Sequence, residues 1–186
     1  MGLARLSTIL DKYEQKFCEL CSPKALCTVT ISNKPKDRLI NFDKVKNSYF
    51  SYTSRKPKSC DGLKINNALL FFELKQDVYF KNHSLLDLHT EFSNKINESV
   101  EVLLKVFQTE NFNQQEIAKI KSIGEIKYYI VPNMVSPAKK LSIRTSIIKF
   151  TNSYSTNQNY RALYGTQKGF TTKLFVRNCN NLGNIS

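Results

Sequence analysis

Residues 60–75, CDGLKINNALLFFELK, predict two strands joined by a tight turn. The first strand is short and covers 60–65. The second covers 68–75 and is strongly apolar, as strands are when a mixed sheet buries both of their faces. The turn falls at Asn66-Asn67, because asparagine tolerates a positive φ better than most residues. The apolar strand ends in charge, and this end is where chemistry is expected.

The alternation of side chains along a strand predicts which charged groups meet. Residues i and i+2 project from the same face, so Glu73 and Lys75 project together. A two-residue turn places Asp61 opposite Phe72, whereas a three-residue loop over 66–68 places it opposite Glu73 on the same face. A site built from Asp61, Glu73 and Lys75 therefore requires the three-residue loop, or a bulge with the same effect.

Two carboxylates and a lysine in this arrangement suit the hydrolysis of phosphodiester bonds. Carboxylate oxygens are hard ligands for Mg²⁺ or Mn²⁺, which lowers the pKa of a bound water and neutralises charge on phosphoryl oxygens. A lysine beside the metal stabilises developing negative charge and offsets repulsion between the carboxylates and an incoming anion. The alternative without a function is an edge hairpin with a surface salt bridge, which contributes little to stability.

The pattern of Asp61 followed by Glu73-Leu74-Lys75, with eleven residues between the two acids, resembles the PD-(D/E)XK phosphodiesterase (restriction-endonuclease-like nuclease) superfamily. The resemblance covers residues ~3–131 and implies an α/β fold with an αβββαβ core, in which a small mixed sheet lies between helices. It implies a divalent-metal-dependent endonuclease that prefers DNA to RNA, and a role in defence against foreign DNA. Cys60 replaces the family's proline, and no Gln-centred motif stands clearly on the second predicted helix.

The resemblance also assigns residues to roles. It implies catalysis by Asp61, Glu73 and Lys75, and binding of Mg²⁺ or Mn²⁺ by Asp61, Glu73 and Leu74. The family often adds an acid from its first helix. At about 100° per residue, Glu14 lies beside the apolar stripe of Leu10 and Phe17, whereas Glu19 points nearly opposite. Glu14 is therefore the fourth catalytic candidate, and the alternative is a solvated charge on the flank of the helix.

The positive charge of the chain is unevenly placed. The formal net charge is +13, and after Glu125 there are nine basic residues and no acidic one. A surface this one-sided repels itself unless it meets a polyanion, and nucleic acid is the usual one. The nucleic-acid-binding residues expected here are Lys139, Lys140, Arg144, Lys149 and Arg161. The alternatives are a non-catalytic basic nucleic-acid-binding module, an interaction subunit that meets an acidic partner, and a solubilising surface.

Hydrophobic spacing predicts the other elements. The surest is a helix of about 23 residues that begins at the cap Ser84. We also expect helices at 3–21 and 114–122, a loop at 33–47, and strands at 26–32, 48–54, 126–131 (ended by Pro132) and 174–176. The segment 136–147 is left open between helix and strand. We divide the chain into a nuclease-like core, 1–135, and a basic C-terminal extension, 136–186, packed on the same domain.

The remaining composition narrows the protein class. Five cysteines form no disulfide-like framework, which favours reduced thiols in a cytoplasmic protein. The spacing of Cys18, Cys21 and Cys27 could begin a zinc site, but no second CxxC or His pair follows. No apolar run is long enough to span a membrane. Two histidines, His83 and His89, are too few for a His-based site, and a surface or packing role is expected. A homodimer or a larger complex is left open.

Overall fold

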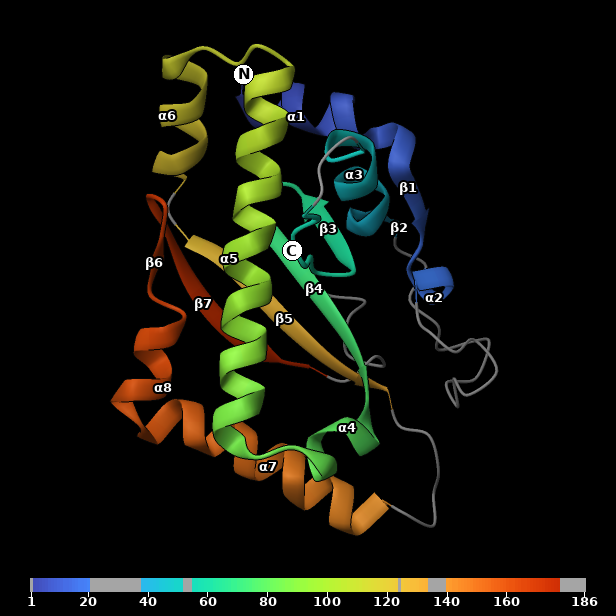
Figure 1. The fold of residues 1–186 in the computed structure, drawn as a ribbon, viewed down its shortest axis with the longest axis vertical. Coiled ribbons are helices and arrows are strands. Elements are labelled where there is room, and N and C mark those ends of the chain that lie inside the picture. The colour runs from blue at the N-terminus through green and yellow to red at the C-terminus, as the bar shows by residue number, and fades with distance from the viewer. Residues whose placement is uncertain (1, 21–37, 52–54, 124, 134–139, 178–186) are drawn as a thin grey trace.

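The computed structural model describes residues 2–20, 38–51, 55–123, 125–133 and 140–177. One seven-stranded mixed sheet, in the order β1-β2-β3-β4-β5-β7-β6, lies at the centre (Figure 1). The predicted α/β class with a mixed sheet is therefore confirmed. The strands are β1 (Glu14–Lys16), β2 (Arg38–Asn41), β3 (Gly62–Ile65), β4 (Leu69–Gln76), β5 (Glu125–Asn133), β6 (Thr166–Gln167) and β7 (Phe170–Val176).

The strands pair antiparallel from β1 to β4 and parallel from β4 through β5 to β7, and β6 closes the far edge antiparallel to β7. Helix α5 lies across one face of the sheet, in the crossover that a parallel β4–β5 pair requires (Figure 1). The helices are α1 (Gly2–Leu10), η1 (Asp11–Tyr13, a 3₁₀ turn), α2 (Phe17–Leu20), α3 (Phe42–Tyr49), α4 (Asp77–Asn82), α5 (Leu85–Thr109), α6 (Gln114–Ser122), α7 (Lys140–Thr156) and α8 (Gln158–Leu163). Among the described helices, none combines the length and apolar character that crossing a bilayer requires.

The β3–β4 hairpin has the register that the candidate site needs. Ile65 pairs with Leu69, so residues 66–68 form a three-residue loop. Continuing the same register beyond the last pair places Asp61 opposite Glu73. The two-residue turn at Asn66-Asn67 is thus replaced by the longer loop.

Two local contacts hold this hairpin in place. Within the loop, the side-chain oxygen of Asn66 accepts a hydrogen bond from the backbone N–H of Ala68 at 3.1 Å. At the other end, Gly62 packs against Leu39 of β2, where a Cβ would lie 2.8 Å from the Leu39 Cδ1. Any larger residue directly after Asp61 would require the buried Leu39 side chain to shift.

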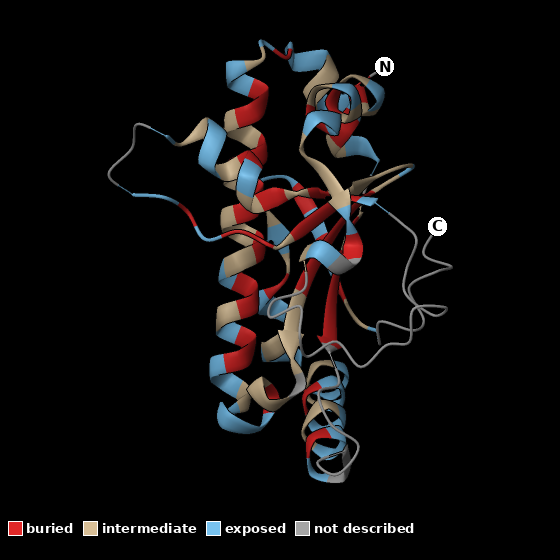
Figure 2. Cartoon of the chain, turned by 90° about the vertical axis from the view of Figure 1, so that its right-hand side faces the viewer, coloured by how far each residue is buried: buried red, intermediate tan, exposed pale blue. Residues whose placement is uncertain are grey.

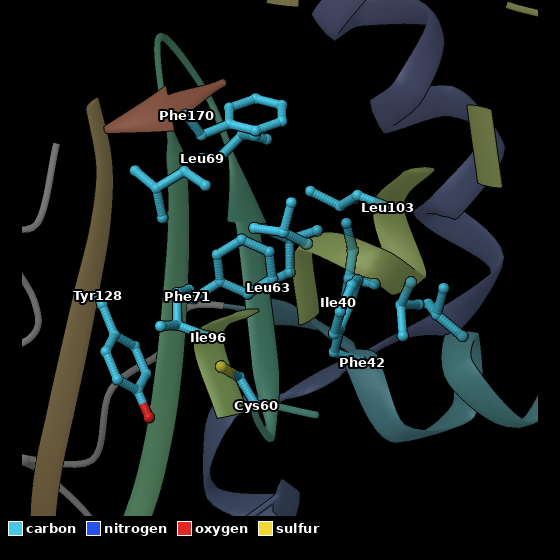
Figure 3. Close-up of a cluster of buried hydrophobic side chains, with 14 of the residues drawn as sticks. Ile40, Phe42, Cys60, Leu63, Leu69, Phe71, Ile96, Leu103, Tyr128 and Phe170 are labelled. Carbon is cyan, nitrogen blue, oxygen red and sulfur yellow. The ribbon is translucent and has the colours of Figure 1, made fainter. Parts of the chain in front are cut away.

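The apolar strand β4 is buried on both faces, as predicted. Leu69 and Phe71 belong to the larger core beneath α5, and Leu70 and Phe72 belong to a second core on the opposite face. Buried residues are concentrated in the strands and on the side of α5 that faces them (Figure 2). Figure 3 shows the larger core, where Phe71 lies among side chains of the neighbouring strands and α5. Glu73 shares the parity of Phe71 and therefore lies beneath α5.

The two predicted helices between β4 and β5 are confirmed. Helix α5 has 25 residues, and its cap Ser84 accepts a hydrogen bond from the backbone N–H of Asp87. Helix α6 occupies the predicted residues, and a capping box of Asn113 and Glu116 begins it. Local sequence therefore specifies both helix starts.

The predicted helix at 3–21 is wrong beyond residue 10. The chain forms α1, then the 3₁₀ turn, the strand β1 and the short helix α2. Leu6 and Leu10 lie in the core beneath α5, whereas Phe17 lies in the core on the opposite face of the sheet. One straight helix cannot reach both faces, so the strand β1 carries the chain along the sheet edge between them.

The predicted loop at 33–47 and strand at 48–54 are also wrong where the structure describes them. Residues 38–41 form β2, and residues 42–49 form α3. Phe42 and Val45 are buried on the inner face of this helix, and the side chain of Asn41 caps it. The first two residues of the run that predicted a strand, Ser48 and Tyr49, thus end a capped helix. The predicted strand at 26–32 lies outside the described residues.

The C-terminal third continues the same sheet. The segment left open between helix and strand is helical from residue 140, and the predicted strand at 174–176 extends over the whole of β7. Pro132 does not end β5, because it lies beyond the last β5–β7 pair, Ile130–Val176, where its missing N–H breaks no ladder with β7.

His89 joins α5 to the C-terminal helices. It is fully buried, with Nε2 2.8 Å from the Ser153 Oγ and Nδ1 3.1 Å from the Tyr164 hydroxyl. Its ring stacks between Phe150 and Tyr160, with centroids 4.4 and 4.3 Å away. The Ser153 hydroxyl donates to the Phe150 carbonyl, so the Nε2–H donates to serine and Nδ1 accepts from tyrosine. His89 thus has the predicted packing role.

We expect His89 to make the fold less stable in acid. Burial lowers the pKa of His89 from 6.5 to about 4. Between these values the unfolded chain takes up a proton that the native protein does not, so the free energy of unfolding falls as the pH falls through this window. Urea unfolding across this range should show the advantage of the parent over His89→Phe shrinking by about 3 kcal/mol. The exposed His83, changed to Gln, should leave the profile unchanged, and parallel profiles for parent and His89→Phe would contradict the assignment.

Candidate functional site

Asp61 and Glu73 meet at the start of β3, beside the second half of β4. Glu73 is fully buried on the face beneath α5. Asp61 directly precedes β3, and its Oδ2 accepts a hydrogen bond of 2.6 Å from the backbone N–H of Leu74. The aspartate side chain therefore fills the place beside β4 that a longer β3 would take. The structure brings the two predicted acids together.

Two lysines neutralise one oxygen of the buried Glu73. The Nζ of Lys95, on α5, lies 2.5 Å from Oε1, and the Nζ of Lys75 lies 3.3 Å from the same oxygen. The other oxygen, Oε2, is buried and has no hydrogen-bond partner. Burial, and then the charge of Asp61, raise the pKa of Glu73 to about 7 although both lysines lower it. Among the described residues, Oε2 of Glu73 is thus a buried carboxylate oxygen that no donor satisfies.

The charges of Asp61 and Lys95 are coupled to the same cluster. Burial raises the pKa of Asp61, and the nearby ammonium of Lys95 opposes this shift. Burial alone would lower the pKa of Lys95, but the charges of Glu73 and Asp61 raise it above its usual range. Lys95 is thus a cation held against both acids.

Lys75 is held by a second pair of contacts. Its Nζ lies 3.2 Å from Oε1 of Glu91 on α5 and 4.3 Å from the ring centroid of Tyr79 on α4. The Tyr79 hydroxyl donates to the other oxygen of the same glutamate. Lys75 therefore has a fixed position between Glu73 and Glu91. Its ammonium contacts Glu73 on the same face of β4, as predicted.

Helix α3 supports Asp61 from behind. The backbone N–H of Phe42 donates to the Asp61 carbonyl at 3.1 Å. Next to it, the Asp43 carboxylate accepts from the Ser59 hydroxyl at 2.6 Å and lies 2.5 Å from the Nζ of Lys46. The charge of Asp43 contributes to the raised pKa of Asp61. A second acid, Asp43, thus lies near Asp61 in addition to Glu73.

The donors near Asp61 and Glu73 are oxygens of the kind that a hard divalent cation takes. Within the described residues, no group of three or more His, Cys, Asp and Glu side chains is arranged as a metal site. Two carboxylates and a main-chain oxygen remain as donors. The N–H and C=O of one strand residue point to the same side, so the Leu74 carbonyl faces the side on which its N–H meets Asp61. Asp61, Oε2 of Glu73 and this carbonyl suit Mg²⁺ or Mn²⁺, which keeps several waters.

Glu14 does not join this cluster. It lies on β1 rather than on a helix, and its carboxylate is 3.0 Å from the guanidinium of Arg38 on β2. The expectation that it approaches from a first helix is therefore wrong, because the helix ends before it. Of the cysteines whose spacing could begin a zinc site, Cys21 and Cys27 lie outside the described residues.

The basic residues of the C-terminal third are partly described. Arg144 and Lys149 on α7 and Arg161 on α8 are exposed, while the side chains of Lys139 and Lys140 lie outside the described part of the chain. Helix α7 packs on α4, which directly follows the end of β4 (Figure 1). The exposed cations of α7 and α8 therefore lie at the end of the molecule where β4 ends, beyond Glu73 and Lys75 (Figure 1).

Sequence reasoning missed Glu91, Lys95 and Tyr79. The two α5 residues are four apart and each directly precedes a buried residue of the apolar stripe, Phe92 and Ile96. Residues four apart share a helix face. Charged side chains flanking the buried stripe at this spacing, opposite a strand that ends in Glu73 and Lys75, were the pattern that could have identified them.

We expect the Glu73–Lys95 pair to be strongly coupled in stability. At about pH 8, where Glu73 is charged, Lys95→Met should lower the free energy of unfolding by about 3 kcal/mol, because it leaves a buried carboxylate without its nearest cation. Adding Glu73→Gln should recover most of this loss in urea unfolding. The exposed pair Arg38–Glu14 provides the matched cycle, with a coupling of about 1 kcal/mol or less. Additive effects at the buried pair would show that the two charges do not depend on each other.

Comparison of the chain with family models, with curated proteins and with solved structures finds no match in any of the three. The geometry of the residues themselves is therefore the basis of a functional assignment.

Proposed function

We propose that the protein is a divalent-metal-dependent nuclease that hydrolyses phosphodiester bonds of nucleic acid, with DNA favoured. The observation that carries the proposal is the Glu73 carboxylate, which is fully buried, has one oxygen without a partner, and lies opposite Asp61. A buried polar atom without a hydrogen bond is destabilising. A bound cation satisfies this oxygen and the adjacent aspartate together.

The arrangement of the elements supports a restriction-endonuclease-like core. An acidic hairpin, β3 and β4, is followed by the long helix α5 and the parallel strand β5, in the order that the αβββαβ core requires. Helix α1 and strand β2 precede the hairpin as this order requires, and β1, α2 and α3 are additional elements among them. The strands β6 and β7 then extend the sheet beyond the core.

Each residue of the site has a role in this proposal. Asp61, Glu73 and the Leu74 carbonyl hold Mg²⁺ or Mn²⁺, which when bound supplies an acidified water and neutralises phosphoryl charge. Lys75 stabilises the negative charge that develops on the phosphate. Glu91 fixes the direction of its ammonium, together with Tyr79, and is a positioning residue.

We expect Asp61→Ala and Lys75→Ala each to reduce cleavage by about 10²–10³ or more, because each removes a charge that acts on the transition state. Cleavage of plasmid and of single-stranded DNA should be measured with Mg²⁺, Mn²⁺ or chelator. Asp61→Ala should also weaken metal binding, whereas Lys75→Ala should not. Glu14→Gln is the control. The Glu14 carboxylate pairs with Arg38, away from the site, so this substitution should leave cleavage unchanged. Full activity in either site variant would mean that the cleavage has another origin.

We expect the exposed cations of α7 and α8 to bind the phosphate backbone. Replacing Arg144, Lys149 and Arg161 with Gln should weaken binding to all sequences alike and reduce the log–log salt slope by up to about three units, because each cation that contacts a phosphate releases a counterion.

A matched triple variant tests whether location matters. Lys12, Lys44 and Lys119 are exposed at the opposite end of the molecule from α7, on η1, α3 and α6 (Figure 1). Their replacement with Gln removes the same charge and should leave the slope almost unchanged. If the two triple variants change the salt slope equally, nucleic-acid binding depends on the net charge of the protein and not on the cations of α7 and α8.

A further inference from the structure

We infer that Lys95 is an internal counter-ion that occupies the acidic site in the metal-free protein and competes with a divalent cation for it. The inference rests on the proposed function and concerns what governs loading of that site. Its basis is the position of the Lys95 ammonium, 2.5 Å from Oε1 of Glu73 and electrostatically coupled to Asp61. A metal ion would be attracted to the same two acids.

The helix sets the position of this charge. Lys95 lies within the 25-residue α5, between the turns that bury Phe92 and Ile96. The backbone there is fixed by the core of the sheet, so only the side chain of Lys95 can move. That side chain is largely enclosed, with 16% of its surface exposed. The position of the Lys95 ammonium beside Glu73 is therefore set by the packing of α5 on the sheet.

The two lysines of the site have different arrangements. Lys75 divides its contacts among Glu73, Glu91 and the ring of Tyr79, and so has partners outside the acid pair. Lys95 makes the shorter contact with Glu73 and is coupled to Asp61 behind it. Lys75 can keep its position when a metal ion binds, whereas the charge of Lys95 is the one directed into the acid pair.

The charges of the cluster explain why the two cations compete. When Glu73 is ionised, Asp61, Glu73 and Glu91 carry three negative charges and the two lysines carry two positive ones, so the metal-free cluster has one net negative charge. A divalent ion enters against both ammonium groups, and the repulsion is strong because the cluster is shielded from water. Without Lys95, the same ion would meet two net negative charges and one ammonium group.

Calorimetric titration with Mn²⁺ tests the inference without reference to cleavage. Lys95→Met should bind Mn²⁺ about tenfold or more tightly than the parent, because the repelling charge is gone. Without metal, the melting temperature of Lys95→Met should be below that of the parent. On addition of Mn²⁺ it should increase by more than the melting temperature of the parent does. Lys95→Arg keeps the charge and should bind like the parent. Lys105→Met removes the same charge from the C-terminal half of α5 and should also bind like the parent.

The outcomes separate this inference from the proposed function. Equal or weaker Mn²⁺ binding by Lys95→Met, or an equal gain in Lys105→Met, overturns the role of Lys95. Asp61→Asn added to Lys95→Met should remove the gain; if it does not, Mn²⁺ binds elsewhere and the proposed function fails as well. Absence of Mn²⁺ binding by every variant also overturns both. If Lys95→Met does not fold without metal, Lys95→Gln supplies the same comparison, because its amide can still donate to Glu73.

Discussion

The burial of the Glu73 carboxylate under α5 is the constraint around which the neighbouring elements are arranged. Strand β4 is covered on both faces, so a charge near its end cannot reach water. An uncompensated buried charge is strongly destabilising, so cations must be brought to it. One comes from two residues along the same strand, and the other comes from α5. The rotation of α5 about its axis is therefore set by two requirements at once, which are burial of its apolar stripe and placement of Lys95.

The same ion pairs compensate the buried acid from within the protein. The site contains two lysines against the acids, and Glu91 and Tyr79 fix one of them. Many small metal sites fold only when the ion is present, because their ligands repel one another without it. Here the ion pairs supply that compensation. In the proposed nuclease, folding and metal loading would thereby be separate steps.

The hairpin, the long helix and the candidate acids were predictable because each depends on local sequence. Side-chain parity along β4 places Glu73 and Lys75 on one face whatever the rest of the chain does, and Ser84 caps α5 directly. The three-residue loop was one of two explicit alternatives. Lys95 and Glu91 were missed because the rotation of α5 against the sheet is a property of packing. Glu14 was misplaced for a related reason, since its spacing fits a helix but the chain must cross from one face of the sheet to the other.

The position of β7 has a consequence for synthesis on the ribosome. Strand β5 lies in the middle of the sheet, yet the partner on one of its sides comes from residues 170–176, which are translated after α7 and α8. Until those residues emerge, the apolar β5 presents an unpaired edge. Such edges pair readily with other chains, and nascent intermediates that expose them aggregate. The hairpin of β6 and β7 is short and local, so that once translated it can form and cover this edge quickly. Between the synthesis of β5 and that of β7, the nascent chain is therefore most prone to aggregate with other copies of itself.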